Sequence, residues 1–383
     1  MRRTSIVVVL MAVACGESTA PSRPNVRITT SPELVASFMS LGGVHDLTAL
    51  VTDTLGASSS EVVTWDVVPS SAAVTVDQGM VTVAPSALPG EYRVRASALG
   101  VSDTTIVRVL PRPSGKLVFT AMVGGLNQVF VKDFAIDGDA VQITNGASAS
   151  GGLGVDGATG TIVASIGTLP NVDLFRMNTD GSGLVNLTNN LSASNQGPTF
   201  NRATGEIYFS RRGLTTLSTQ IFRMQPDGSS LAEVTSGSQG KVQPAISPDG
   251  LSLSWSEQFP GFNGEIVTSS IDGATPVRFT DRAGIDGQSY WLSNSRVAWS
   301  GALTTAPDVF AADAPGGTNA LNLTNGEGSS SQPSAGCSPG TITILRRIEG
   351  QNAIYQFDMA SKLAVKYTLP VERVIGFARR VCE

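Results

Sequence analysis

Few side chains in this chain could carry out a reaction. Its 383 residues contain a single histidine, His45, so neither histidine-based catalysis nor a multi-histidine metal site is expected. The spacings H-E-x-x-H and C-x-x-C do not occur, and no serine nucleophile elbow follows the repeats described below. We therefore expect no cofactor, no bound metal ion and no catalytic residue.

Arginine pairs are the groups best suited to contact a ligand, because a guanidinium binds a carboxylate or phosphate through two parallel hydrogen bonds. Arg211-Arg212 and Arg346-Arg347 lie at the ends of two corresponding predicted strands. They are either ligand contacts or solvated charges on a rim. Arg379-Arg380 lies in the last predicted strand and is expected to line a central channel.

Three aspartates, Asp180, Asp227 and Asp272, recur at matching tight turns and invite a calcium interpretation. Each stands alone at its turn, without other carboxylates close in the sequence. An aspartate at such a turn accepts hydrogen bonds from its own backbone. We therefore interpret these residues as turn formers and predict no metal site.

The first fourteen residues are interpreted as an export signal, with Arg2-Arg3 followed by the apolar run Ile6–Ala14. Small residues directly before Cys15 resemble the bacterial lipobox, in which the cysteine thiol carries a diacylglycerol. The resemblance implies a lipoprotein anchored through Cys15. Because Gly16 is not aspartate, it also implies sorting to the outer membrane, facing the periplasm or the cell surface. The alternative is an ordinary signal cut near Ala14. Residues 15–24 are expected to form a flexible tether.

The second half of the sequence is organised by a repeat. Residues 171–189 (NVDLFRMNTDGSGLVNLTN) predict a β-hairpin with an Asp-Gly turn that ends in Leu-Thr. Six copies close at Thr144, Thr188, Thr235, Thr280, Thr324 and Thr368, in steps of 44, 47, 45, 44 and 44 residues. Four short strands repeated at this period predict a β-propeller of six blades.

The best-preserved repeat, residues 243–250 (QPAISPDG), is similar to the repeat of TolB-like propellers. The resemblance extends from about residue 115 to the end of the chain and implies the fold without implying a chemistry. We assign the propeller to residues 112–383, after the proline-rich boundary at Leu110–Gly115.

The ends of the propeller predict how the ring closes. The first repeat begins at Lys116 without an innermost strand, and an unassigned strand, Arg373–Cys382, remains after the sixth repeat. We expect this strand to complete the first blade, which would leave no open sheet edge. Cys337 and Cys382 would then meet between neighbouring blades and form a disulfide, as expected in an exported protein. The alternative is two buried thiols.

Residues 25–111 predict a separate antiparallel β-sandwich of short alternating strands. The segments 49–53 (ALVTD), 63–65 (VTW) and 74–77 (VTVD) resemble the bacterial immunoglobulin-like group 2 domain. The fold class is therefore all-β, with an immunoglobulin-like sandwich followed by a six-bladed propeller.

Composition bears on the function as well. A net charge of −5 gives no basic surface for nucleic acid, so no nucleic-acid partner is expected. We expect a non-catalytic envelope lipoprotein whose propeller binds a protein or an envelope polymer. The alternative is a carbohydrate-active enzyme, a polysaccharide lyase or glycosidase, with its site at the channel mouth. Such an enzyme needs converging acids, and the innermost strands offer only Asp156, Asp249 and Asp286.

Overall fold

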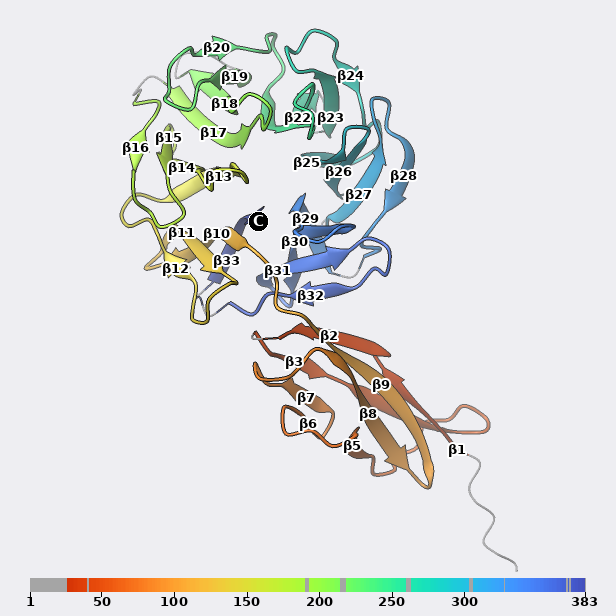
Figure 1. Cartoon of the computed structure of the whole chain (residues 1–383). Helices are drawn as coiled ribbons and strands as arrows, with labels where there is room; N and C mark the ends of the chain where they lie inside the picture. The colour runs from red at the N-terminus through yellow and green to blue at the C-terminus, as the bar shows by residue number, and fades with distance from the viewer. Residues whose placement is uncertain are drawn as a thin grey trace, which may run out of the picture.

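The computed structural model describes residues 26–39, 41–189, 193–213, 218–259, 263–302, 306–326, 328–369, 371 and 373–382. This part of the chain consists of strands and turns, which confirms the all-β class. It contains no helix long and apolar enough to cross a membrane. Cys15 and the predicted tether lie outside the described residues. Figure 1 shows a ring of six blades with a smaller sandwich beside it.

The sandwich contains nine strands in three small sheets. One sheet pairs β1 (Val26–Ser31) with β4 (Thr48–Asp53), and a second has the order β3 (Gly43–Asp46), β7 (Met80–Val83), β6 (Val74–Asp77). The third has the order β2 (Leu34–Phe38), β9 (Val101–Leu110), β8 (Gly90–Ala98), β5 (Thr64–Val68). Valines of these strands form the core, where Val74, Val94 and Val107 are fully buried.

Strands β2 and β3 are not foreseen by the sequence pattern. In β2 the last four residues are buried on both faces, so the strand lacks the alternation of apolar and polar residues. Val35 packs in the sandwich core, whereas Ala36 and Phe38 pack against the propeller. In β3, His45 Nε2 hydrogen-bonds to Ser37 Oγ of β2 at 2.8 Å, and burial lowers the pKa of this histidine. The only histidine therefore has a structural partner.

Each blade has four antiparallel strands, counted here from the axis outward, and one parallel bridge, Gly264–Ile285, joins the sheets of blades 4 and 5. The innermost strands of blades 2 to 6 are β13 (Ala149–Val155), β17 (Ala193–Phe200), β21 (Lys241–Ile246), β25 (Ile285–Ser293) and β29 (Ser329–Ala335). The second strands of blades 1 to 6 are β10 (Lys116–Val123), β14 (Ile162–Thr168), β18 (Ile207–Gly213), β22 (Ser252–Phe259), β26 (Arg296–Ala302) and β30 (Thr341–Ile348). The third strands are β11 (Leu126–Asp133), β15 (Asn171–Met177), β19 (Gln220–Met224), β23 (Asn263–Ser270), β27 (Asp308–Asp313) and β31 (Gln351–Asp358). The outermost strands are β12 (Val141–Gln142), β16 (Val185–Asn186), β20 (Ala232–Glu233), β24 (Val277–Arg278), β28 (Thr318–Asn322) and β32 (Ala364–Lys366).

In five of the six blades, the threonine that closes the repeat fastens the end of the outermost strand to the third strand. In blade 4 the Thr280 hydroxyl accepts a hydrogen bond from the Ile266 backbone N–H at 2.9 Å and donates one to Glu265 at 2.6 Å. Blades 1, 2, 3 and 5 repeat this arrangement with Thr144–Gln128, Thr188–Asp173, Thr235–Gln220 and Thr324–Asp308. In blade 6 the corresponding third-strand residue is Ala353, and the Thr368 hydroxyl donates instead to the Gly42 backbone carbonyl of the sandwich at 3.4 Å. The closing threonine of the repeat thus marks a hydrogen-bonded clamp in blades 1 to 5.

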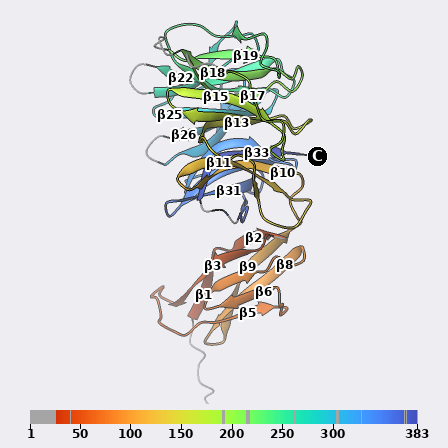
Figure 2. The same cartoon turned by 90° about the vertical axis from the view of Figure 1, so that its left-hand side faces the viewer.

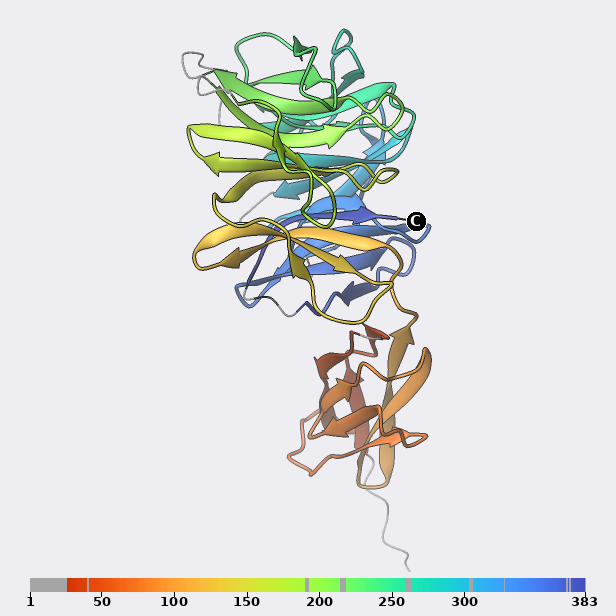
Figure 3. The ribbon, with the colours of Figure 1, turned by 60° about the vertical axis from the view of Figure 1, so that its left-hand side comes forward.

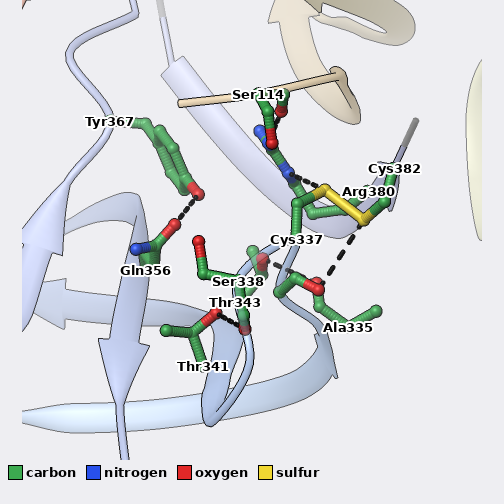
Figure 4. Close-up of a disulfide and its surroundings, with 11 residues drawn as sticks. Ser114, Ala335, Cys337, Ser338, Thr341, Thr343, Gln356, Tyr367, Arg380 and Cys382 are labelled. Carbon is green, nitrogen blue, oxygen red and sulfur yellow. Dashed lines mark hydrogen bonds between the residues drawn. A yellow bond between two sulfur atoms is a disulfide. The ribbon is translucent and has the colours of Figure 1, made fainter. Parts of the chain in front are cut away.

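The ring is closed by the C-terminal strand, as predicted. Strand β33 (Arg373–Val381) pairs antiparallel with β10 and becomes the innermost strand of blade 1. The expected disulfide joins Cys337, just after β29, to Cys382, just after β33, with a Cα–Cα distance of 5.2 Å. Arg380 lies beside this bond and donates from Nε to Cys337 Sγ at 3.2 Å (Figure 4). Its Nη2 donates to the backbone carbonyl of Ser114, at the start of the propeller.

The sandwich joins the propeller at the rim, where the ring closes. Phe38 is 2% exposed and packs with Phe134 and Tyr367 of the propeller. The sandwich extends outward from the rim next to blades 1 and 6 and does not lie over a face of the disc (Figure 2 and Figure 3). Strand β1 begins at the end of the sandwich that lies away from the propeller (Figure 1). The sandwich therefore holds the start of β1 away from the propeller.

Candidate binding site in the propeller channel

A cavity of about 640 Å³ lies at the centre of the ring. All six innermost strands contribute to its lining, from Gly152 in blade 2 round to Arg379 in β33. Its volume falls within the roughly 300–1,000 Å³ that is typical of small-molecule sites. The propeller thus has an axial cavity large enough for a ligand.

The innermost strands share a bulge that brings polar groups to this cavity. Gly197, Gln243, Gln288 and Gln332 occupy the same position in blades 3 to 6, each at a shift in register, with φ values of 62°, 57°, 55° and 53°. Non-glycine residues rarely adopt this left-handed conformation. The glutamines keep this conformation because the backbone N–H of each bulge residue donates a hydrogen bond to the preceding blade. Gln243 N–H donates to Ser210 Oγ of the preceding blade at 2.9 Å.

Two glutamine side chains continue this network from blade to blade. Gln243 Oε1 accepts from the backbone N–H of Gln288 at 3.2 Å and from the Ser256 hydroxyl at 3.3 Å. Gln288 Oε1 accepts in the same way from the backbone N–H of Gln332 and from the Ser300 hydroxyl. These donors require a carbonyl oxygen, which fixes the orientation of both amides. The Nε2 groups of Gln243 and Gln288 donate to no other described residue, so they are available to a ligand.

Arginines lie toward both ends of the cavity. Arg212 pairs in register with Ser194 near the start of β17, whereas Arg202 follows the end of the same strand. Neither Arg202 nor Arg212 makes a hydrogen bond or ion pair with another described residue, and both are exposed. Arg212 also lines an adjoining hollow of about 390 Å³ with Gln239 and Phe259. The cavity therefore offers unpaired positive charge at each end.

Tyr290 of β25 lies at the Arg202 end of the cavity, together with Arg379 of β33. Burial raises the pKa of the Tyr290 hydroxyl, and the charges of Arg202 and Arg379 act on it in the opposite direction. The phenol therefore stays protonated at neutral pH and can donate a hydrogen bond. Its hydroxyl makes no hydrogen bond to another described residue. Three blades thus bring two guanidinium groups and one phenol together.

Acidic residues are absent from the described lining of this cavity. Of the three acids that the sequence predicts in or next to the innermost strands, Asp156 caps its own turn and Asp249 accepts from Ser247 Oγ at 2.6 Å. Asp286 is 2% exposed and forms an ion pair with Arg282 at 2.6 Å. The described residues also contain no cluster of three or more His, Cys, Asp or Glu that could hold a metal ion. Paired carboxylates for glycoside hydrolysis are not present in the described lining.

The two arginines of each predicted pair lie in different environments, because successive side chains of a strand point to opposite faces of the sheet. Arg211 is half-buried over the Phe222 ring and donates to Asn195 at 3.0 Å. Arg346 is 5% exposed, lies over the Tyr355 ring and donates to Ser330. Solvated rim charge is therefore the wrong interpretation for Arg346. The second members, Arg212 and Arg347, are exposed, and of these two only Arg212 lines the cavity.

The C-terminal pair is divided in the same way. Arg379 is half-buried and lines the channel, where its charge acts on Tyr290. Arg380 also borders the cavity but is 3% exposed, and its guanidinium lies over the rings of Phe134 and Tyr367. Its hydrogen bonds to Cys337 and Ser114 make it part of the ring closure.

Sequence reasoning missed Arg202, Tyr290 and the glutamines. The glutamines had a signal, because Gln243 and Gln332 both precede a proline at the same point of the repeat. Tyr290 is the one tyrosine of the predicted innermost strands, but nothing in the sequence relates it to Arg202, because the two residues come from different blades.

The sequence matches no protein-family model and no curated protein. Among solved structures, the chain is similar to TolB from Acinetobacter baumannii, with a TM-score of 0.59 and 11% identity over 78% of this chain and 81% of that one. It is similar to a chain of a nidogen/laminin complex, with a TM-score of 0.55 and 14% identity over 69% of this chain and 98% of that one. It also resembles Kuenenia stuttgartiensis hydrazine synthase, with a TM-score of 0.56 and 13% identity over 69% of this chain and 45% of that one. These likenesses show the fold: the larger part of this chain is a β-propeller like that of TolB.

Proposed function

We propose that this protein is a non-catalytic, lipid-anchored binding protein of the bacterial cell envelope. In this proposal Cys15 carries the lipid and the sandwich, as an immunoglobulin-like stalk, spaces the head from the outer membrane. The propeller binds a protein or an envelope polymer at its channel. The observation that carries the proposal is the axial cavity, whose described lining has arginine, glutamine, serine and tyrosine side chains but no carboxylate.

The arrangement of the two parts supports a binding role. The sandwich meets the rim of the disc and lies over neither of its faces (Figure 2). In this proposal both faces of the propeller disc stay accessible to a ligand, because the stalk is attached at the rim. A rigid head of this kind suits recognition, although a fold by itself does not imply a function.

The enzyme alternative retains one supporting observation, the convergence of Tyr290 with Arg202 and Arg379. A lyase would need a base to remove a proton from the sugar, and an ionised tyrosine could serve. Burial raises the pKa of Tyr290, which favours the protonated phenol and therefore a donor role. We keep binding without turnover as the proposed function.

The test is capture from envelope extract with immobilised protein that begins at Val26. The wild-type protein and the control Arg347→Glu should retain the same component, because Arg347 is exposed on the rim and does not line the cavity. The double variant Arg202→Glu/Arg212→Glu should lose it, because it reverses the charge at both ends of the cavity. Equal capture by all three proteins would place the binding surface elsewhere. Shortening of an added polysaccharide by the wild-type protein would establish the enzyme instead.

A further inference from the structure

We propose that the end of the cavity formed by Arg202, Tyr290 and Arg379 binds the carboxylate of an acidic carbohydrate, a chain that contains uronic acids. The inference rests on the proposed binding function and names its ligand class. Three observations support it. They are the positive charge of the cavity, the amide and hydroxyl groups of its lining, and the backbone N–H groups of the innermost strands that are already hydrogen-bonded.

The charge of the cavity is opposite to that of the protein. The whole chain carries −5, yet the described lining contains four arginines and no acidic residue. A concave site lined by one sign of charge concentrates ligands of the other sign. Arg380 is engaged in the ring closure, whereas Arg202 and Arg212 are exposed and have no described partner. Arg379 lines the cavity beside Tyr290. A guanidinium matches a carboxylate through two parallel hydrogen bonds, and the protonated Tyr290 phenol supplies a further donor.

The wall between the charged ends matches hydroxyl groups. The amide nitrogens of Gln243 and Gln288 have no described acceptor, because their oxygens are used between the blades. Ser194, Thr199 and Ser289 add hydroxyls to the same lining. The amide nitrogens donate, and the hydroxyls both donate and accept, as ring hydroxyls of a sugar require. An anion without hydroxyls would use only the arginines and the tyrosine.

The strand edges argue against an extended peptide as the ligand. A peptide would add to an innermost strand through a continuous row of backbone groups. In blades 4, 5 and 6 a bulge interrupts this row, and the N–H groups of Gln243, Gln288 and Gln332 are bonded to serines of the preceding blades. The channel therefore presents side chains where β-strand addition needs free backbone. Of the two polymers that carry carboxylates, the acidic carbohydrate fits this wall better.

The test is isothermal titration calorimetry of the protein that begins at Val26, at low and constant ionic strength. A trimer of galacturonate should bind, and its methyl ester, which keeps the hydroxyls but loses the charge, should bind at least about tenfold more weakly, a difference of about 1.4 kcal/mol. Arg202→Gln should weaken the trimer by at least about tenfold. Tyr290→Phe should weaken it while leaving the ring in place. The control Arg347→Gln should bind as the wild type does.

Other ligands define what would overturn the inference. Acetate and inorganic phosphate should bind more weakly than the trimer; equal binding would mean a general anion site. An aspartate-rich peptide that binds more tightly than the trimer would mean a peptide site. If the trimer does not bind while envelope capture still depends on Arg202 and Arg212, this inference fails and the proposed function stands. If capture is also independent of these arginines, both fail.

Discussion

Phe38 of the sandwich stacks on Tyr367 of the propeller, with ring centroids 5.2 Å apart and planes inclined by 13°. Tyr367 in turn lies under the guanidinium of Arg380, which hydrogen-bonds to the disulfide sulfur of Cys337. The contact between the two domains and the closure of the ring are therefore one continuous cluster.

Phe38→Ala should weaken the docking of the sandwich on the propeller. The side chain is 2% exposed, and removing a buried phenylalanine ring costs about 3–5 kcal/mol. We expect two separate unfolding transitions in calorimetry in place of a coupled one, with faster proteolysis at the Leu110–Gly115 boundary. Val44→Ala is the control, since Val44 is 62% exposed on the same domain. An unchanged melting profile for Phe38→Ala would show that the contact does not couple the domains.

Loss of the disulfide should destabilise the propeller. Cys337 and Cys382 are separated by 45 residues, and the chain-entropy estimate for a loop of this length is about 4 kcal/mol. Urea unfolding of Cys337→Ala/Cys382→Ala should show a loss of this order relative to the oxidised wild type. Thiol titration of the wild type in denaturant without reductant should detect neither cysteine. Two titratable thiols would contradict the bond.

Thr280→Val should destabilise blade 4. The substitution removes the donor to Glu265, which is fully buried, and the acceptor of the Ile266 N–H. Leaving buried polar groups without a partner costs about 1–3 kcal/mol. Thr368→Val in blade 6 is the matched comparison, because Thr368 is exposed and its hydroxyl donates to the Gly42 backbone carbonyl at 3.4 Å and not to a buried side chain. We expect an effect within about 0.5 kcal/mol there. Equal losses in both variants would contradict the role of the clamp.

Asp103 should make the sandwich sensitive to acid. Its Oδ2 accepts from the Thr30 backbone N–H at 2.7 Å and from the Thr30 hydroxyl at 2.9 Å. These bonds hold the pKa of the carboxyl below its ordinary value of 3.8. The stabilisation is therefore present above that value and is lost as the pH falls through the lower pKa of the folded state. The difference in melting temperature between wild type and Asp103→Asn should shrink between neutral pH and about pH 2.5. A difference that is independent of pH would contradict this role.

Cys15→Ser should release the protein from the membrane. The prediction follows from the small residues before Cys15 and the polar segment after it. Fractionation of cells should move the variant from the membrane to the soluble periplasmic fraction, while Ser18→Ala in the same segment should remain in the membrane. Retention of Cys15→Ser in the membrane would mean that the anchor lies elsewhere.

The sequence by itself determined the architecture, because the information is local and repeated. Each Asp-Gly turn joins two adjacent strands, each closing threonine bonds within its own blade, and chain order makes consecutive blades neighbours. The missing first strand and the surplus last strand then leave one way to close the ring, which also brings Cys337 to Cys382.

Only the tertiary structure decided which side chains meet at the channel. Arg202, Tyr290 and Arg379 come from three blades that are far apart in sequence, and no pattern relates them. Neighbouring arginines such as Arg346 and Arg347 look equivalent in the sequence, yet strand alternation buries one and exposes the other. Strand β2 was hidden for a related reason, since it is covered by valines on one face and by the propeller on the other. The alternation of apolar and polar residues along a strand predicts which of its faces is buried in its own domain. A binding site or a domain interface depends on what contacts the other face, which the local sequence does not encode.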